Sequence, residues 1–328
     1  MLNRYRNKRK TSKKQEKIVK GTESSLTVIR SHGGLPVERG NGARKSEPSW
    51  CLAPVLGKPG DLVKIVKDHK VDKVVVALQE RRGTLPLRDL LDCKFNGVVV
   101  EDSPTFYEEM TGKIPVAGLY PSSLIFSSGF KKSKVLLLTK RFLDIAASLA
   151  LLIVSFPISI VTAVAIKLDS KGPVLFSQER AGEREKVFKI YKFRSMHTDA
   201  EKHGPRWASD NDDRVTRVGR IIRKLRIDEI PQLYNILKGD MSFVGPRPER
   251  PYFVEQLKKQ IPFYSERFWV KPGLTGWAQI NYSYGASVED ALEKLQYDLY
   301  YIKHLSITLD IAIILQTIKV VLVGRGAR

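Results

Sequence analysis

The chain has 328 residues, which is long enough for two domains that each bury a core of their own. Its 56 Lys and Arg residues outnumber its 35 Asp and Glu residues, and the net charge of +21 indicates an anionic partner such as nucleic acid, phospholipid or a phosphorylated substrate. The two cysteines, Cys51 and Cys93, lack metal-binding or redox spacing, which argues against a disulfide framework and fits a reducing, cytoplasm-facing location.

Residues 1–50 form a polar leader in which nine of the first 20 residues are Lys or Arg and one is Glu. No apolar stretch follows this basic start, so it is neither a signal peptide nor a folded element. Such a tail is either simply solvated or attached to anionic lipid. Because the leader as a whole lacks sustained periodicity, we expect it to be disordered.

Residues 51–134 alternate between two kinds of pattern. Segments with helical spacing of apolar residues are separated by short β-branched runs, and a Ser-Pro pair begins a further helix. The alternation predicts a small parallel sheet flanked by helices, a truncated α/β domain of Rossmann-like type. No G-x-G-x-x-G motif follows a strand, so we expect an interaction or regulatory module and not a nucleotide site. The helical segments are 60–69 and 87–94, the strands are 73–77 and 98–100, and the last helix begins at 103.

The most apolar part of the chain is Ile145–Ile166, 22 consecutive residues without a charge. A bilayer core about 30 Å thick needs about 20 apolar residues as a helix. Ser155 and Pro157 interrupt the run, and because Pro157 removes a backbone donor we expect a bend there, with nearby hydroxyls satisfying the freed groups. Basic residues flank both ends and favour the cytoplasmic face, so a re-entrant hairpin over residues 135–172 suits both flanks, whereas a straight span suits one. A buried core helix is the alternative.

Residues 173–328 are predicted to form a mainly helical α+β domain. Two short strands, 173–176 and 187–193, are expected to form a basic β-hairpin. Residues 214–226 spell RVTRVGRIIRKLR, a basic amphipathic helix that suits a bilayer interface, a row of phosphate contacts or an ordinary packed helix with a solvated face. The apolar stretch 309–323 is interrupted by polar residues and is expected to be a packed or interfacial helix.

An acidic pair, Asp228 and Glu229, follows the basic helix directly and precedes Pro231, which suits the start of another helix. Successive helical side chains diverge by about 100°, so the two carboxylates can have different tasks. One can attack phosphorus while the other helps to hold Mg²⁺, which typically takes one or two carboxylates plus substrate phosphate oxygens. A solvated helix start is the alternative for this pair.

Two later segments favour phosphate chemistry. Arg247 lies between Pro246 and Pro248 and has little backbone freedom, so its guanidinium can be aimed at a phosphate at low ordering cost. Residues 270–279, VKPGLTGWAQ, combine Lys271 with a Gly-rich turn of exposed amides and with Trp277. This combination suits a diphosphate cradle with a stacked base, and equally a structural loop.

The segment from about Lys140 to Ala327 resembles the bacterial sugar transferase family, the monotopic polyprenyl-phosphate phosphoglycosyl transferases that start exopolysaccharide and glycan assembly on a lipid carrier. The resemblance covers more than half of the chain. The matching stretches are KRFLDI at 140, the Ser-Phe-Pro break, FSQERAG at 176, FKIYKFRSM at 188, RIDEIPQLYNILKGDMSFVGPRPE at 226 and VKPGLTGWAQ at 270.

This resemblance implies transfer of a sugar-1-phosphate from a UDP-sugar to undecaprenyl phosphate, with release of UMP, at the cytoplasmic face of the bacterial inner membrane. In that family the Asp of the pair is a nucleophile that forms a covalent phosphosugar intermediate and the Glu supports Mg²⁺, roles that carry over to Asp228 and Glu229. Arg223 and Arg247 match arginines expected near substrate phosphates, and Lys271 is expected to bind phosphate with them. The family's broken hydrophobic helix enters and leaves one leaflet.

Residues 55–83 and 100–130 resemble the Rossmann-like domain of longer initiating transferases, which usually carry several transmembrane helices before it. A basic membrane-anchored scaffold or anion-binding protein without catalysis is the alternative function, and an inactive remnant is a third. No nucleic-acid-binding motif is recognisable, so nucleic acid is not an expected partner. The identity of the sugar and the oligomeric state stay open.

Overall fold

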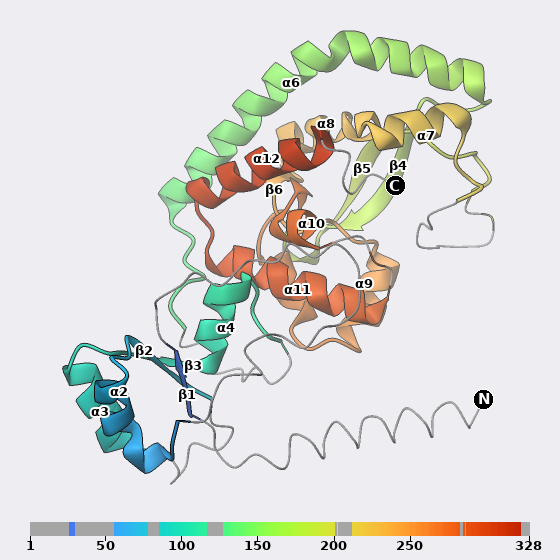
Figure 1. The fold of residues 1–328 in the computed structure, drawn as a ribbon. Helices are drawn as coiled ribbons and strands as arrows, with labels where there is room; N and C mark the ends of the chain where they lie inside the picture. Colours follow the sequence, from blue (N-terminus) through green and yellow to red (C-terminus); the bar gives the residue numbers. More distant parts are fainter. Residues whose placement is uncertain are drawn as a thin grey trace, which may run out of the picture. The chain divides into compact units, whose positions relative to one another are not determined.

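The computed structural model describes residues 26–29, 56–77, 85–116, 127–200, 202, 212–282, 285 and 287–322. The chain divides into two compact units, Met1–Met110 and Thr111–Arg328. Each unit mixes helices and strands, and Figure 1 shows their elements coloured in chain order.

The first unit contains a three-stranded sheet in the order β1-β2-β3. β1 is antiparallel to β2, and β2 is parallel to β3. The predicted alternation of helices and strands over 60–103 is confirmed, but a Rossmann-like domain stays a prediction because the described residues of this unit contain a single parallel pair. The elements are β1 (Leu26–Ile29), the 3-10 turn η2 (Pro59–Asp61), α2 (Leu62–Asp68), β2 (Lys73–Val76), α3 (Leu87–Phe95), β3 (Val99–Asp102) and α4 (Ser103–Thr111).

β1 lies within the leader for which no folded element was expected, so that expectation is wrong for these four residues. Its backbone pairs with the β-branched run of β2 from Leu26 opposite Val76 to Ile29 opposite Lys73. The other residues of the leader lie outside the described part of the chain. The unit has its own apolar core, made by Leu62, Val66, Val71, Val74, Val76, Leu90, Cys93 and Val98.

The second unit is dominated by α6 (Lys134–Asp169), a single helix of 36 residues that continues through Pro157. Figure 1 shows that the helix is bent, yet the chain does not reverse into two separate helices. The Ser159 hydroxyl donates to the Ser155 carbonyl at 2.9 Å and Thr162 to the Ile158 carbonyl at 2.8 Å. The predicted bend is therefore confirmed. Both hydroxyl bonds lie beside the proline, but neither reaches the Ile153 carbonyl that Pro157 leaves without its helical donor. The re-entrant hairpin is not confirmed and stays a prediction.

The side of α6 that faces the rest of this unit is largely polar. Its inner positions recur every three or four residues, as one face of a helix requires. Most of the large apolar side chains point outward, and Phe142, Ile153 and Val154 are each more than 70% exposed. A surface helix of a soluble protein turns its apolar face to the core and its polar face to water, whereas α6 turns its polar face to the core. The buried or half-buried inner positions are Asp144, Ser148, Leu152, Ser155, Ser159, Thr162 and Ile166.

The remaining elements form a mainly helical fold with two small sheets. One sheet is the predicted antiparallel hairpin, whose first strand begins two residues later and ends five residues later than expected. The other is a parallel pair that the sequence did not predict. The hairpin and the segment after it comprise β4 (Leu175–Ala181), the turn η3 (Glu183–Glu185), β5 (Val187–Phe193), α7 (Arg217–Lys224), the turn η4 (Ile227–Glu229), α8 (Gln232–Lys238) and β6 (Ser242–Val244). The last elements are α9 (Pro251–Lys258), the turn η5 (Tyr264–Trp269), β7 (Gly273–Thr275), α10 (Trp277–Asn281), α11 (Val288–Lys303) and α12 (Ile307–Leu322).

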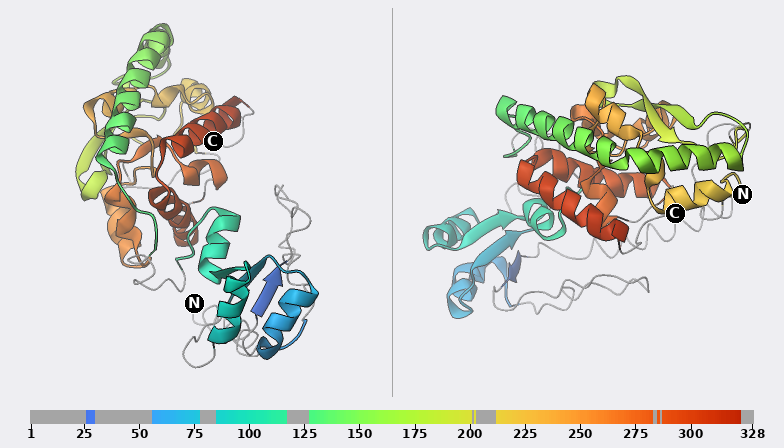
Figure 2. Two further views of the ribbon diagram at one scale, coloured as in Figure 1. Left: turned by 90° about the vertical axis from the view of Figure 1, so that its left-hand side faces the viewer. Right: turned by 90° about the horizontal axis from the view of Figure 1, so that it is seen from above.

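Polar contacts anchor the first half of α6 to this fold. The guanidinium of Arg141 donates to the carbonyls of Ile236 and Leu237 at 2.5 and 2.6 Å, where α8 ends and a cation is favoured by the helix dipole. Lys140 pairs with Asp310 of α12 at 2.5 Å, and the views of Figures 1 and 2 agree in placing these two helices near each other. The KRFLDI stretch therefore fastens α6 to the domain.

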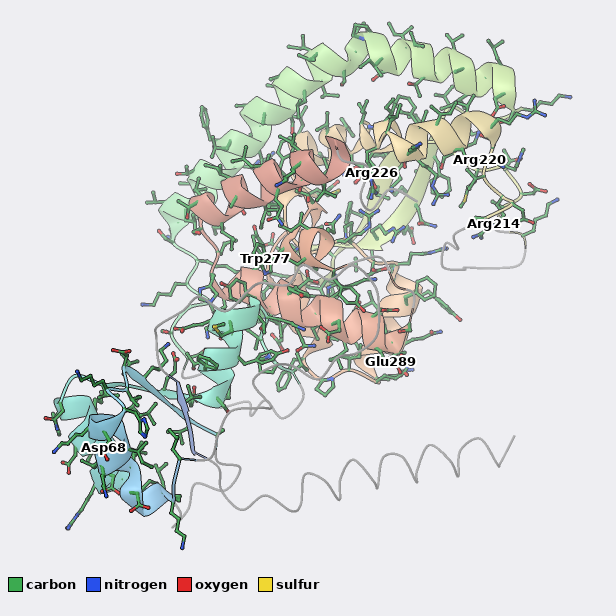
Figure 3. All side chains as sticks on the ribbon, viewed as in Figure 1. Asp68, Arg214, Arg220, Arg226, Trp277 and Glu289 are labelled. Atoms are coloured by element: carbon green, nitrogen blue, oxygen red, sulfur yellow. The ribbon has the colours of Figure 1, made fainter. Side chains whose placement is uncertain are left out.

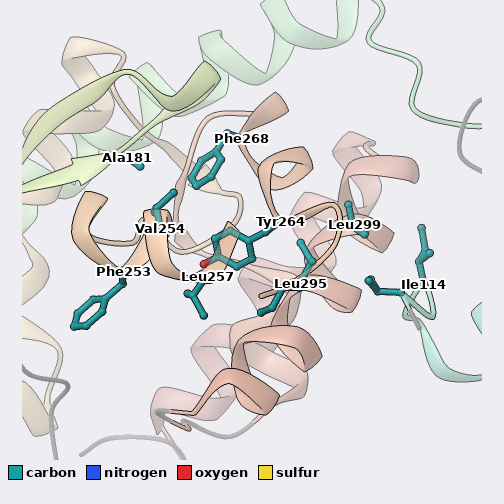
Figure 4. Close-up of a cluster of buried hydrophobic side chains, with 11 residues drawn as sticks. Ile114, Ala181, Phe253, Val254, Leu257, Tyr264, Phe268, Leu295 and Leu299 are labelled. Carbon is teal, nitrogen blue, oxygen red and sulfur yellow. The ribbon is translucent and has the colours of Figure 1, made fainter. Parts of the chain in front are cut away.

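The apolar core formed by α9, η5 and α11 includes residues that precede α6 in the chain. Ile114 and Val116 are buried beside Leu295 and Leu299 of α11, and Figure 4 shows Ile114 beside this cluster. The Ile114 amide also donates to the carbonyl of Gln296 at 3.0 Å. Residues 111–116 thus belong to the second unit by packing, whereas the sequence placed a domain boundary at 134.

Candidate active site around an acidic pair

The chain geometry between α7 and α8 turns the acidic pair inward. α7 begins at the Thr216 cap, whose hydroxyl accepts from the Gly219 amide at 2.9 Å. Gly219 has no room for a side chain, because a Cβ there would lie 2.0 Å from the Ser195 carbonyl oxygen. After α7, Arg226 takes a left-handed conformation with φ of 57°, which ends the helix and starts the turn η4. Figure 3 shows Arg226 at the end of α7.

Asp228 and Glu229 are both buried, with 7% and 9% of their surface exposed. The alternative of a solvated helix start is therefore wrong. Two neighbouring carboxylates in an apolar setting repel each other and lose hydration, so positive groups are needed to hold them. The candidate site is built from the groups that meet this need.

Glu229 is held by cations from two distant segments. Its Oε1 atom lies 2.9 Å from Lys192 Nζ on β5 and 3.0 Å from Arg247 Nη2 in the Pro-Arg-Pro turn. Burial acts to raise the pKa of Glu229, but the charges of Lys192, Arg247 and Arg226 outweigh burial and hold it well below its ordinary value. Glu229 is therefore a permanent carboxylate at neutral pH.

Asp228 has the opposite electrostatic balance. Burial, followed by the negative charge of Glu229, raises the pKa of Asp228, while Lys192, Arg226 and Arg223 act to lower it. The charge of Arg223 thus acts on the carboxylate of Asp228, while the expected binding of a substrate phosphate by Arg223 stays a prediction. Of the two carboxylates, Asp228 has the more basic oxygens.

Lys192 is a site residue that the sequence analysis did not select. It lies within the strand expected over 187–193, for which the sequence predicted a basic hairpin and no site residue. Side chains alternate along a strand, and Ile190, two residues earlier, is 3% exposed, so Lys192 shares the inward face. Burial lowers the pKa of Lys192 and Glu229 opposes that effect. The alternation of side chains along the strand could therefore have identified Lys192 from the sequence, as a lysine on the buried face of the hairpin.

Every carbonyl of the segment 246–249 accepts a hydrogen bond from another part of the fold. The four donors come from β4, the turn η5 and β7, so the turn that carries Arg247 is held on several sides. The bonds run from Gly273 N to Pro246 O (2.9 Å), Arg267 Nη2 to Arg247 O (3.1 Å), Arg180 Nη1 to Pro248 O (3.0 Å) and Ala181 N to Glu249 O (2.9 Å).

The segment 270–279 does not have the predicted form of an open cradle. The Gly273 amide is bonded to Pro246, and Gly245 donates to Thr275, so this segment supports the Pro-Arg-Pro turn. Trp277 stacks on Tyr300 and donates to the Gly112 carbonyl at 2.7 Å. A base-stacking role for this ring is therefore not supported, and the alternative of a structural loop accounts for these contacts.

Lys271 is not brought to the acidic pair. Its Nζ atom lies 3.5 Å from the position that a Cβ would take on Gly239, which follows the last residue of α8. The acidic pair precedes the other end of α8, and seven residues of helix span about 10 Å. The structure thus brings Arg247 into contact with Glu229, next to Asp228, and Arg223 acts on Asp228 through its charge. A phosphate-binding role for Lys271 stays a prediction.

The donor set of the site is compatible with a divalent cation that also binds substrate. Within the part of the chain that the structure describes, no group of three or more His, Cys, Asp or Glu side chains could by itself hold a metal. Mg²⁺ usually keeps waters and uses one or two carboxylates plus phosphate oxygens. Both cationic partners of Glu229 contact Oε1, so Oε2 and the Asp228 carboxylate are the oxygen groups that fit this requirement.

The sequence of the chain matches known proteins over most of the second unit. A model of the bacterial sugar transferase family matches residues 135–324. The chain is 44% identical over 241 residues to the UDP-N-acetylgalactosamine-undecaprenyl-phosphate N-acetylgalactosaminephosphotransferase of Aeromonas hydrophila, which covers 74% of this chain and 56% of that relative. It is 40% identical over 279 residues to the undecaprenyl-phosphate glucose phosphotransferase of Komagataeibacter xylinus, which covers 83% and 52%.

A further relative is the UDP-glucose:undecaprenyl-phosphate glucose-1-phosphate transferase of Escherichia coli (strain K12), 38% identical over 284 residues, which cover 82% of this chain and 59% of that protein. The chain thus spans little more than half the length of these relatives, from 52% to 59%. Their names agree on undecaprenyl phosphate and differ in the sugar.

Proposed function

Because the chain belongs to the bacterial sugar transferase family, we propose that it transfers a sugar-1-phosphate from a UDP-sugar to undecaprenyl phosphate and releases UMP. The observation that carries this proposal is the buried acidic pair with Lys192 and Arg247 on one of its two carboxylates. Two anionic substrates repel each other, and a site that gathers fixed cations around a carboxylate pair offsets that repulsion.

Asp228 is the proposed nucleophile. One of its carboxylate oxygens attacks the phosphorus that bears the sugar, the bond from that phosphorus to the UMP oxygen breaks, and UMP leaves. In the second step a phosphate oxygen of undecaprenyl phosphate attacks the same phosphorus, and the Asp228 carboxylate is released. Splitting the transfer in this way lets the two substrates bind in turn.

The electrostatic difference within the pair supports this choice of nucleophile. Glu229 has its Oε1 atom in two ion pairs and a strongly lowered pKa, so its lone pairs are poorly available. Asp228 has a raised pKa and so presents the more basic oxygen. Glu229, Lys192 and Arg247 then act as fixed charges around the reacting phosphate.

The proposed cofactor is Mg²⁺. Oε2 of Glu229 and the carboxylate of Asp228 are the groups that would hold it, together with substrate phosphate oxygens. When bound, the ion would supply neutralisation of the charge on the diphosphate. Arg223 and Arg247 are proposed to add to this effect from the protein side.

A membrane location is proposed from the outer face of α6. Among the described residues, α6 is the one helix long and apolar enough to cross a bilayer. A soluble helix of this kind would bury its apolar side, whereas α6 turns Asp144, Ser148 and Thr162 inward and leaves most of its large apolar side chains outside. Hydrocarbon is the solvent that suits this arrangement. We further propose that α6 enters and leaves the cytoplasmic leaflet of the inner membrane.

The direct test uses the full chain purified in detergent with UDP-N-acetylgalactosamine, UDP-glucose and UDP-galactose. With at least one donor we expect UMP release that depends on undecaprenyl phosphate, and intact-mass detection of a phosphosugar adduct. Asp228→Asn should abolish both signals, while Asp240→Asn, which alters an acid paired with Lys238 at 2.9 Å, should keep them. An active Asp228→Asn variant would remove the proposed nucleophile, and no reaction with any donor would favour the non-catalytic anion-binding alternative.

A further inference from the structure

Arg267 is a buried arginine outside the acidic pair that contacts the turn carrying Arg247. It is 5% exposed and is held on three sides. Its Nη1 atom donates to the Tyr264 hydroxyl at 2.6 Å, and its Nη2 atom lies 2.8 Å from Asp298 Oδ2 on α11. The same Nη2 atom donates to the Arg247 carbonyl oxygen at 3.1 Å.

The ion pair between Arg267 and Asp298 costs free energy because both charges lose their hydration in the core. Burial raises the pKa of Asp298 to about 6 although Arg267 lies beside it, so the loss of hydration outweighs the attraction of Arg267 for the carboxylate. Apolar residues of similar volume often stabilise a fold as well as a buried ion pair does. Stability alone therefore gives a weak reason for the pair, and its contact with Arg247 gives a stronger one.

The backbone around Arg247 makes that contact effective. Pro246 and Pro248 restrict the backbone on both sides, so the orientation of the peptide group between Arg247 and Pro248 strongly constrains where the Arg247 side chain can reach. Arg267 holds the carbonyl of that peptide group. The guanidinium of Arg247 then reaches Oε1 of Glu229 at 3.0 Å.

We propose that Arg267, held by Asp298, is a positioning residue that aims the guanidinium of Arg247 at the acidic pair. This rests on the proposed sugar-phosphate transfer, in which Arg247 neutralises charge on the reacting phosphate. A misplacement of about 1 Å of such a group can cost as much as ~100-fold in rate, so the positioning contact is expected to act on kcat more than on KM.

The test is a cycle of variants of the full chain. The double substitution Arg267→Met with Asp298→Leu removes the pair without leaving a buried charge uncompensated. We expect kcat to fall by at least ~10-fold with little change in KM. In an Arg247→Ala background the same double substitution should change kcat by less than about 2-fold, because it acts through Arg247. An equal loss in both backgrounds would overturn the proposal.

Two further variants separate positioning from folding. Tyr264→Phe removes another hydrogen bond of Arg267 and leaves its bond to Arg247, so kcat should change by less than about 2-fold. Arg267→Lys keeps the charge beside Asp298 but replaces the planar fork by a single ammonium, and should lower kcat by about 10-fold. If the double variant does not fold, the Arg267→Lys result decides, and full activity there counts against the proposal.

A structure of the double variant gives a readout that does not need activity. The distance between Arg247 Nη2 and Glu229 Oε1 should increase beyond about 4 Å, the limit of an ion pair. An unchanged distance would overturn the positioning role whether or not the enzyme turns over. Failure of the wild-type chain to release UMP would instead refute the proposed function and leave this distance as the test of the positioning role.

Discussion

The Nζ atom of Lys192 lies 2.9 Å from the Oε1 atom of Glu229, although 37 positions separate the two residues in the sequence. The contact joins the hairpin strand β5 to the acidic pair and helps to keep Glu229 ionised in a buried setting.

Replacement of Lys192 by Met should lower kcat by about 100-fold, because a buried carboxylate loses one of its two cations and the phosphate loses a fixed charge. Lys192→Arg should retain more activity since it keeps the charge. Lys189→Met is the matched control, because that lysine is exposed on the same strand and should leave kcat unchanged. UMP release measures all three, and equal activity of the Met variants would contradict the role of Lys192.

The pH dependence of the reaction should reflect Asp228. Its pKa is raised by burial and by Glu229, and the proposed nucleophile is the carboxylate. Activity should therefore fall as the pH falls through a value above the ordinary Asp pKa of about 3.9. Glu229→Gln removes the neighbouring negative charge, so the acid limb of kcat/KM should move to lower pH, although the rate is reduced. A move to higher pH would contradict the assignment.

The same group links stability to pH with a definite sign. Because the pKa of Asp228 is higher in the folded than in the unfolded state, the folded state binds the proton more tightly. The contribution of Asp228 to the free energy of unfolding therefore falls as the pH rises from the unfolded to the folded pKa. Between these two pKa values, the midpoint of thermal unfolding should depend less on pH in Asp228→Asn than in the wild-type chain. The same pH dependence in both proteins would argue against the raised pKa of Asp228.

Arg141→Ala should weaken the attachment of α6 to α8. The variant loses two hydrogen bonds from a charged donor to the Ile236 and Leu237 carbonyls, and we expect a loss of about 2–3 kcal/mol in the free energy of unfolding. Thermal unfolding in detergent measures the change. Lys134→Ala, at the exposed start of the same helix, should have little effect. Equal midpoints for the two variants would contradict an anchoring role for Arg141.

Labelling can decide how α6 lies in a membrane. In a chain with Cys51 and Cys93 changed to Ser, single cysteines at Lys131 and Lys171 place a thiol beyond each end of the helix. A membrane-impermeant maleimide should label both from the cytoplasmic side of inverted vesicles. Labelling from opposite sides would establish a straight span and refute the re-entrant arrangement.

The packing of Ile114 in the core beside α11 predicts a large effect from a residue that precedes α6. Ile114→Ala should lower the free energy of unfolding by about 2–5 kcal/mol, because Ile114 is 4% exposed in the core of the second unit. Val135→Ala is the control, since Val135 is 72% exposed. If the two variants unfold at the same temperature, residues 111–116 do not contribute to this core as described.

Local pattern was sufficient to predict about half of the elements that the structure shows. The helices at 62–68, 87–95 and 217–224, the hairpin and the long apolar helix all follow from periodicity, proline and charge, because each of these acts over a few residues. Asp228 and Glu229 were also identified from sequence, as an acidic pair that stands out against a basic neighbourhood.

The partners of that pair were decided by tertiary structure. Lys192 reaches Glu229 because strand alternation and the hairpin turn it inward, and Arg247 does so because distant donors hold its turn. Lys271 looked equivalent in sequence but lies near the other end of α8. Side-chain chemistry is visible along the chain, whereas the pairing of charges depends on which segments pack together, and no local pattern contains that information.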